Sequence, residues 1–417
     1  MTISRPKNTY GLEGRNFPIY EDFSDMQRII VGAHKGESKQ KTKPTKILVP
    51  VENFKKFNEN KQIFEEFFEW LTDRQIQFEF SEISKHKRPM IFGDFNFDFV
   101  SLFSGGLDSG SLPLIDEFRN SRGLLHHTHT SHRMYHVARE VYQKCIPKNH
   151  KISFSNLDLE STADIPLLHI RGVTFLTNLL CIAAEHGITK VIIPENGPLM
   201  INYPVASTVS PTRTANPDMI QKWTEIFKKI TNAKIKVQTP FINKTKSEVI
   251  LMSKTKTLIE HTWSCSTSQG ISKMCGICMA CFVRILSLYA IDLDENINSR
   301  YLYNPFKISS STLKESRMTT FRILINCLEF WKNIIQHDEI KNNIEKERFE
   351  NLAKKYPILE KFSLDMYVGI QNYLKNNNDS EILGKTSMEY LNIIDNKILE
   401  MRQKALQRLR KKYGWIT

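Results

Sequence analysis

The pattern of apolar and polar positions predicts short strands and amphipathic helices in the first part of the chain. Residues 46–51 and 78–83 have the apolar and aromatic runs of strands. Between them, residues 62–71 place isoleucine, phenylalanine and leucine at helical spacing. We interpret this aromatic stripe as core rather than as a ligand-binding surface, because it follows the period of a helix face that packs inward. Residues 1–95 are therefore expected to form an α+β extension.

From about residue 97 the pattern alternates buried strands with helices. Strands are predicted at residues 97–103, from Leu124 and at 190–194, and helices at 109–118, 137–145 and 171–186. Apolar strands that alternate with helices indicate a parallel sheet with both faces covered. The sequence therefore predicts an α/β fold with a doubly wound parallel sheet over residues 96–300. In such sheets ligands bind at the carboxyl ends of the strands, where Ser104, His129 and Glu195 fall.

Residues 301–417 change to the apolar–polar period of helices, which predicts a C-terminal α-helical domain.

The composition of the 417 residues, 41% hydrophobic and 25% charged, is typical of globular proteins. No run of eighteen apolar residues occurs, and the first residues lack the apolar segment of a signal peptide, so we expect a cytoplasmic protein without membrane contact. The net charge of +13 is spread along the chain without interleaved aromatic residues, which favours a solvated basic face over nucleic-acid binding.

The predicted strand at 97–103 ends in the sequence SGGLDS, residues 104–109, which is suited to wrapping an anion. Gly105 and Gly106 remove the Cβ atoms that would block a close backbone approach, and a following helix would present N–H groups to phosphate. The loop lacks the Lys-Ser or Lys-Thr ending of a Walker A motif and the G-x-G-x-x-G of a dinucleotide fold. An ordinary glycine turn that caps a helix is the alternative, but the whole hexapeptide after an apolar strand favours a phosphate loop.

Four of the seven cysteines have the spacing C-x9-C-x2-C-x2-C, at Cys265, Cys275, Cys278 and Cys281. Four thiolates suit a closed, tetrahedral zinc site that fixes a loop rather than activates water. An iron–sulfur cluster is the alternative, although the fourth Cys-Pro of a ferredoxin run is missing. The other three cysteines are isolated, and we expect them to be buried apolar residues.

The loop SGGLDS resembles the PP-loop of ATP pyrophosphatases, which cleave ATP between the α and β phosphates. Its pairing with TWSCSTSQGISKMCGICMACFVR, residues 262–284, resembles the QueC family of 7-cyano-7-deazaguanine synthases. Pro240, Lys246, Ser247 and Glu248 agree with that family in order and spacing, and Arg171 matches the arginine that starts its long helix. The resemblance covers about residues 97–293 and implies a PP-loop, adenine nucleotide α-hydrolase-like sheet with a structural zinc loop.

The resemblance also implies ATP and Mg2+ as cofactors, with Zn2+ held by the four clustered cysteines. It places the ATP phosphates against Phe103, Ser104, Gly105, Gly106, Leu107, Asp108 and Ser109. Lys246 and Arg171 are expected to balance charge near an acyl-adenylate, and Asp108 to orient the loop or the metal. Contacts to the substrate are expected from Glu195, Asn196, Arg213 and Trp263.

Several positions depart from the family pattern. The run HHTHTSHRMYH, residues 126–136, replaces a Tyr-Gly-Gln-Arg-His segment, and residues 194–197, PENG, replace a Gly-x-Asn segment. Five histidines in that run invite a metal-site interpretation, but strand-end and surface positions account for them better. The family's Arg-Asn pair is Arg171 and Gly172 here, and a further pocket segment survives only faintly around residues 203–213.

The motifs therefore support the ATP chemistry of the family more strongly than they support a particular product. The family adenylates the carboxylate of 7-carboxy-7-deazaguanine and transfers it to ammonia, giving an amide and then a nitrile. The terminal additions resemble QueC-like components of antiviral defence systems such as Qat, in which a protein amine replaces ammonia and a protein partner binds the extensions. The alternatives are an ordinary synthase, a PP-loop enzyme that modifies tRNA, and an inactive scaffold.

Overall fold

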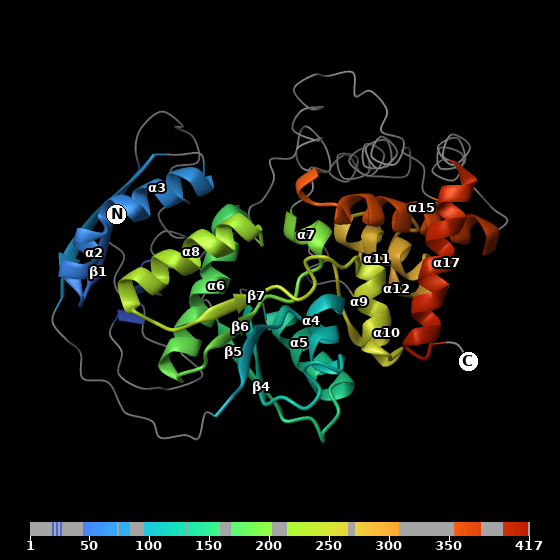
Figure 1. Cartoon of the computed structure of the whole chain (residues 1–417), viewed down its shortest axis with the longest axis horizontal. Coiled ribbons are helices and arrows are strands. Elements are labelled where there is room, and N and C mark those ends of the chain that lie inside the picture. The colour runs from blue at the N-terminus through green and yellow to red at the C-terminus, as the bar shows by residue number, and fades with distance from the viewer. Residues whose placement is uncertain are drawn as a thin grey trace, which may run out of the picture.

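The computed structural model describes residues 19–20, 22–23, 26, 45–72, 75–83, 96–129, 132–158, 168–201, 215–265, 272–307, 354–376 and 395–415. Within these residues an N-terminal unit, a central sheet with its helices, and a set of C-terminal helices follow one another along the longest axis (Figure 1). None of the described helices is both long and apolar enough to cross a bilayer.

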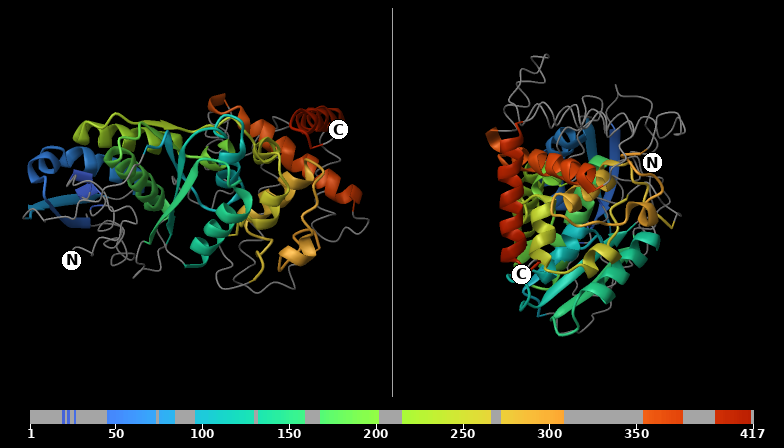
Figure 2. Two further views of the ribbon diagram at one scale, coloured as in Figure 1. Left: turned by 90° about the horizontal axis from the view of Figure 1, so that it is seen from below. Right: turned by 90° about the vertical axis from the view of Figure 1, so that its right-hand side faces the viewer.

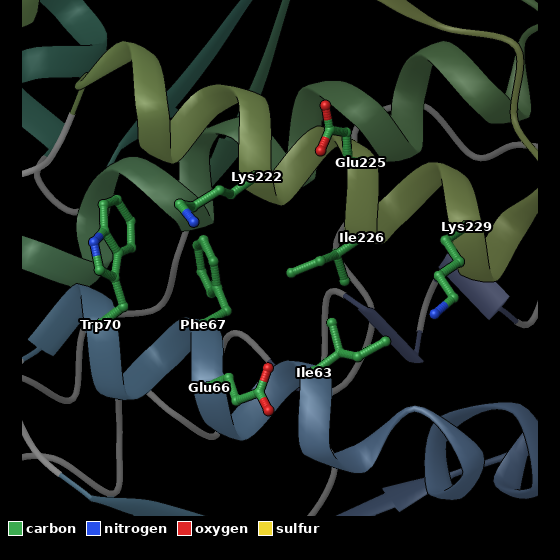
Figure 3. Close-up of a pocket in the computed structure, with 8 residues that line it drawn as sticks. All are labelled: Ile63, Glu66, Phe67, Trp70, Lys222, Glu225, Ile226 and Lys229. Atoms are coloured by element: carbon green, nitrogen blue, oxygen red, sulfur yellow. The ribbon is translucent and has the colours of Figure 1, made fainter.

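The N-terminal unit pairs two strands around two helices. Strands β1 (Thr45–Val51) and β2 (Ile76–Glu82) are parallel, and α2 (Phe54–Glu59) and α3 (Lys61–Thr72) lie between them in the chain. The predicted aromatic stripe of α3 is buried, which confirms that it is core. This core is shared with α8 (Pro217–Thr231), because the ring centroids of Phe67 and Trp223 lie 4.8 Å apart. A groove of about 280 Å³ remains between α3 and α8, where the Lys222 ammonium lies 5.3 Å from the Trp70 ring centroid (Figure 3).

The central sheet has five parallel strands in the order β5-β4-β3-β6-β7. They are β3 (Phe99–Leu102), β4 (Gly123–His129), β5 (Ile152–Asp158), β6 (Lys190–Ile192) and β7 (Lys236–Gln238). The chain runs outward from β3 to β5 and then returns to β6 on the other side of β3. This confirms the predicted parallel sheet and puts its topological switch point between β3 and β6, where open sheets of this kind bind ligands.

Helices cover both faces of this sheet, as the apolar strands predict. Adjacent residues of β3 face opposite cores: Phe99 belongs to a core with α5 (His132–Cys145), and Val100 belongs to a core with α6 (Leu168–Glu185) and α8. The remaining helices of this part are α4 (Leu107–Ser111), the 3-10 helix η1 (Leu112–Leu114), α7 (Gly197–Ile201), α9 (Lys246–Ser253), α10 (Thr257–His261), α11 (Met279–Tyr289) and α12 (Ile297–Arg300).

The helix predicted at residues 109–118 differs from the structure. Helix α4 begins at Leu107 and ends at Ser111, and η1 follows it. Pro113 lacks the N–H that would bond to the carbonyl of Ser109, and its ring would clash there, so the α-helical ladder cannot continue. Gly106 precedes the helix in an extended conformation, with φ −82° and ψ 173°, which sets the earlier start.

The described C-terminal helices pack on the same core as the sheet. Helix α15 (Ile358–Asn376) lies on α11, and α17 (Asn396–Lys412) contacts α15 and α9 (Figures 1 and 2). Gly369 permits this close packing, since a Cβ there would lie 2.2 Å from the Leu286 carbonyl oxygen. These two helices support the predicted helical region, whereas Phe330, Ile340 and Tyr390 lie outside the described residues.

Candidate functional site

The loop at residues 104–109 connects β3 to α4 at the carboxyl edge of the sheet. Gly105 has φ +77°, and a Cβ there would lie 2.9 Å from the backbone of Ala138, so glycine suits both the conformation and the space. The two serines brace the loop: Ser104 N–H donates to Ser109 Oγ at 3.2 Å, and their hydroxyl oxygens lie 3.0 Å apart. The loop is therefore held in its curved conformation by its own side chains.

Asp108, at the start of α4, meets two residues that are distant in the sequence. Lys246 Nζ and Asn196 Nδ2 each donate to Asp108 Oδ2 at 2.7 Å. Lys246 is the first residue of α9, and Asn196 follows β6. The three side chains are buried. The topology thus brings a cation, a carboxylate and an amide together next to the glycine loop.

Glu195 adds a second carboxyl group to this cluster. Burial raises the pKa of Glu195 to about 8, and the nearby charge of Asp108 and a hydrogen bond with it act in the same direction, whereas Lys246 opposes them. Among the described residues, Asp108 Oδ1 has no hydrogen-bond donor unless Glu195 carries a proton. With its pKa raised to about 8, Glu195 is mostly protonated at neutral pH and can hold or release that proton beside the loop.

We expect Glu195 to make stability fall as the pH rises. Between its ordinary pKa of 4.5 and the raised value of about 8, the folded chain binds one more proton at Glu195 than the unfolded chain does. The free energy of unfolding should therefore decrease across this window, by at most about 1.4 kcal/mol per pH unit. Urea unfolding at a series of pH values checks this. Glu195→Gln should flatten the decrease and Glu117→Gln, at an exposed position, should not; equal slopes would contradict the raised pKa of Glu195.

Lys246 is fixed by the cap of its helix. Thr245 Oγ1 accepts from the Glu248 backbone N–H at 3.3 Å, and Glu248 Oε2 accepts from the Thr245 N–H at 3.2 Å. This capping box satisfies two backbone donors at the start of α9 and sets its first turn. Lys246 was a predicted site residue and Glu248 a matched motif position, whereas Thr245 was neither, although its T-x-x-E pattern with Glu248 is typical of a capping box.

Trp263 joins the loop to the cysteine segment. Its backbone N–H donates to the Gly105 carbonyl at 3.2 Å, and its indole N–H donates to the Cys265 carbonyl at 3.0 Å. The Arg133 guanidinium lies 4.3 Å from the Trp263 ring centroid. The partly buried ring therefore lies next to the glycine loop, with the Arg133 guanidinium against it.

The four cysteines form one buried cluster whose sulfur atoms all lie within 4.8 Å of one another. Sγ of Cys275 lies 4.0 Å from Sγ of Cys281, and the same distance separates Cys278 from Cys265. Tetrahedral zinc with Zn–S bonds of about 2.3 Å needs sulfurs at nearly this spacing. The enclosed space suits a single ion better than a cluster of several metal atoms, so the donor set is compatible with structural zinc.

Elemental analysis of the purified protein is expected to find about one zinc per chain. Cys278→Ser should lower the zinc content and destabilise the fold by several kcal/mol, because structural zinc binding contributes directly to folding. Cys145→Ala is the matched control: this thiol is also buried but lies outside the cluster, so the zinc content should not change. Iron with labile sulfide would contradict the zinc assignment.

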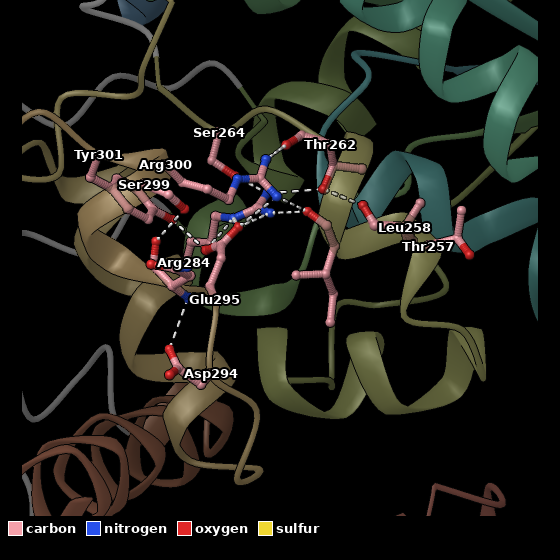
Figure 4. A network of polar contacts seen from close by, with 12 residues as sticks. Thr257, Leu258, Thr262, Ser264, Arg284, Asp294, Glu295, Ser299, Arg300 and Tyr301 are labelled. Carbon is pink, nitrogen blue, oxygen red and sulfur yellow. Dashed lines mark hydrogen bonds and ion pairs between the residues drawn. The ribbon is translucent and has the colours of Figure 1, made fainter.

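A buried ionic network supports the segment between α10 and the cysteines (Figure 4). Arg284 Nε donates to both oxygens of Glu295, at 2.8 and 2.9 Å, and Tyr301 hydroxyl also contacts that carboxylate. The guanidinium further donates to Thr262 Oγ1 at 2.9 Å and to the Ile259 carbonyl at 2.6 Å. Arg284 therefore fixes the segment that carries Trp263. This arginine ends the motif at residues 262–284, whereas no motif in the sequence points to Glu295.

The remaining predicted residues are placed as follows. The Arg171 side chain and all of Arg213 lie outside what the structure describes, although the backbone of Arg171 is in α6. His127 Nδ1 lies 2.6 Å from the Phe103 carbonyl oxygen and His126 Nδ1 lies 2.9 Å from Ser155 Oγ, so both are buried strand residues with hydrogen-bond partners. Among the described side chains only the cysteine cluster gathers three or more potential metal ligands.

One family model matches part of the chain. Residues 166–291 match the family described as "Queuosine biosynthesis protein QueC". This segment contains Glu195, Asn196, Lys246 and the cysteine cluster, whereas the glycine loop lies upstream of it. No curated protein matches the chain.

Proposed function

We propose, from the QueC-family domain that this chain carries at residues 166–291, that the protein activates a 7-deazaguanine carboxylate with ATP. The family is one of PP-loop enzymes that use ATP and are related to 7-cyano-7-deazaguanine synthase. The observation that carries the proposal is the 2.7 Å contact between Lys246 and Asp108. This contact joins the matched segment, which contains Lys246, to the SGGLDS loop, which lies upstream of that segment. It supports the proposal that both motifs belong to one site.

The site supports adenylation by its charges. The substrate carboxylate attacks the α-phosphorus of ATP, pyrophosphate leaves, and an acyl-adenylate forms; an amine then attacks the acyl carbon, and AMP leaves. Activation is needed because a carboxylate resists amines, whereas AMP is a good leaving group. The glycine loop would hold the phosphates, with Mg2+ balancing the charge of pyrophosphate. Lys246 would stabilise the negative charge that develops during transfer.

Glu195 suits the second half of this reaction. The attacking amine loses a proton as the C–N bond forms, and a carboxylate whose pKa is near neutrality is an effective base for that proton. Asn196, the next residue, is held in place by its hydrogen bond to Asp108. We propose that these two residues face the deazaguanine, with Trp263 at the rim and Arg213 as a further contact.

The final acceptor is proposed to be a protein amine, in a QueC-like enzyme of prokaryotic antiviral defence that acts with a protein partner. The altered segment at residues 194–197 and the C-terminal helices packed on the domain favour this over the ordinary synthase. Intact-mass analysis of proteins co-expressed with this chain should then find a deazaguanine-sized adduct. Quantitative conversion of the carboxylate to free nitrile would favour the ordinary synthase instead.

The ATP chemistry has a direct test. Purified protein supplied with ATP, Mg2+, carboxy-deazaguanine and an amine should release AMP and pyrophosphate. Asp108→Ala should reduce this release at least about 100-fold, because it removes the partner of Lys246 in the loop. Formation of ADP and phosphate would contradict the proposal. Titration calorimetry with ATP and Mg2+ adds the test for an inactive scaffold, which should bind neither.

A further inference from the structure

Helix α17 and the residues that follow it, which lie outside the QueC-matched segment, contact both ends of the helix that carries Lys246. At the start of α9, Arg402 donates to Glu248 Oε1 at 3.1 Å. At its end, the Trp415 indole N–H donates to the Leu251 carbonyl at 2.8 Å. The C-terminal region is therefore bonded along the length of α9 rather than to a distant face of the domain.

Glu248 is shared between this contact and the helix cap. Its Oε2 atom accepts the Thr245 backbone N–H, whereas its Oε1 atom accepts Arg402 and lies 3.3 Å from Lys361 of α15. Burial alone would raise the pKa of Glu248, but Arg402 and Lys361 outweigh burial and lower it. The carboxylate therefore stays charged, as a cap acceptor must.

Arg402 is itself fixed in place. Its Nε atom donates to Asp365 Oδ1 of α15 at 2.7 Å, and both side chains are buried. A guanidinium held by one carboxylate can approach the second in only one orientation, because its donors form a rigid planar fork. Arg402 thus sets the position of Glu248 relative to the C-terminal helices.

We propose that Arg402 is a positioning residue for the ATP site. Through Glu248 and the Thr245 cap it holds the first turn of α9, and so keeps Lys246 Nζ at Asp108. The C-terminal helices are then part of the machinery that orients the lysine. The inference rests on the proposed function for its catalytic consequence, but the link from Arg402 to the cap stands on the contacts alone.

The test compares two arginines of α17. Arg402→Met breaks the link to Glu248, whereas Arg410→Met removes an ion pair of the same helix, 2.6 Å long, with Asp292 and leaves Glu248 untouched. In single-turnover assays at saturating ATP, Arg402→Met should slow AMP formation about 10-fold, because small misplacement of a catalytic group is costly. Arg410→Met should stay within about two-fold of the wild type, and Arg402→Lys should recover part of the loss. Equal rates for Arg402→Met and Arg410→Met would overturn the proposal.

Hydrogen exchange separates this inference from the proposed function. The Thr245 amide, which donates to Glu248, should exchange at least about 10-fold faster in Arg402→Met and at the wild-type rate in Arg410→Met. If the wild type forms no AMP and pyrophosphate, the proposed function fails, and this exchange rate still decides the positioning role. Unchanged exchange at Thr245 in Arg402→Met would overturn that role.

Discussion

Lys246→Met is expected to lower the rate of pyrophosphate release by about 100- to 1000-fold, the effect of losing one preorganised charge from a transition state. Lys246 is buried, donates to Asp108 Oδ2 at 2.7 Å and lies against the loop in which phosphate would bind. The change should also destabilise the fold by about 3–5 kcal/mol, because it leaves the buried Asp108 carboxylate without its cation. Steady-state release of pyrophosphate and urea unfolding measure the two effects.

The double variant Lys246→Met/Asp108→Asn distinguishes catalysis from folding. A neutral amide in place of the carboxylate removes the unpaired buried charge, so most of the lost stability should return. The lost activity should not return, because the cation is still missing. Recovery of pyrophosphate release in the double variant would contradict a catalytic role for Lys246.

Arg284→Met is expected to be among the most destabilising single changes, at about 3–5 kcal/mol, since it removes the buried cation beside Glu295 and leaves that buried carboxylate only the partly exposed Arg300. The guanidinium also donates to Thr262 Oγ1, which would lose this donor, and to the Ile259 carbonyl, which would keep its hydrogen bond from Arg300. Chemical denaturation measures the loss in the free energy of unfolding.

Two comparisons make the Arg284 prediction specific. Adding Glu295→Gln to Arg284→Met should restore part of the stability, because it removes the buried charge that has lost its buried partner. Arg300→Met should cost less than Arg284→Met, because Arg300 is partly exposed and lies 3.2 Å from the same carboxylate. A loss below about 1 kcal/mol for Arg284→Met, typical of a surface pair, would contradict the assignment of a buried structural network.

The sequence was most informative where local pattern and local chemistry coincide. Apolar runs predicted β3 and β6 because strands buried on both faces carry no polar alternation. Strand β5 (Ile152–Asp158) lies at the edge of the sheet, and its residues alternate between apolar and polar. It therefore has no continuous apolar run, and the sequence did not predict it. Pro113 in the sequence accounts for the early end of α4, but the start of α4 depends on Gly106, whose extended backbone the pattern does not reveal.

The sequence named Asp108, Lys246 and Asn196, which meet at the loop, but it did not predict their geometry. The loop and the cysteine spacing are contiguous motifs, so the sequence displays them directly. The Lys246–Asp108 contact joins residues 138 positions apart, and it follows from the order of the strands, which no local pattern encodes. The raised pKa of Glu195 likewise arises from burial and from Asp108, and both are products of the folded chain.

Helix α17 reaches the glycine loop through Glu248, the first turn of α9 and the Lys246–Asp108 pair, and this link has a thermodynamic consequence. Coupling between two sites is reciprocal: if occupancy of one alters the affinity of the other, the second alters the first by the same factor. A protein that binds α17 and shifts Arg402 would change the affinity for ATP. ATP, in turn, would change the affinity of the chain for that protein. The affinity for the partner would therefore depend on whether ATP is bound, and the affinity for ATP on whether the partner is bound.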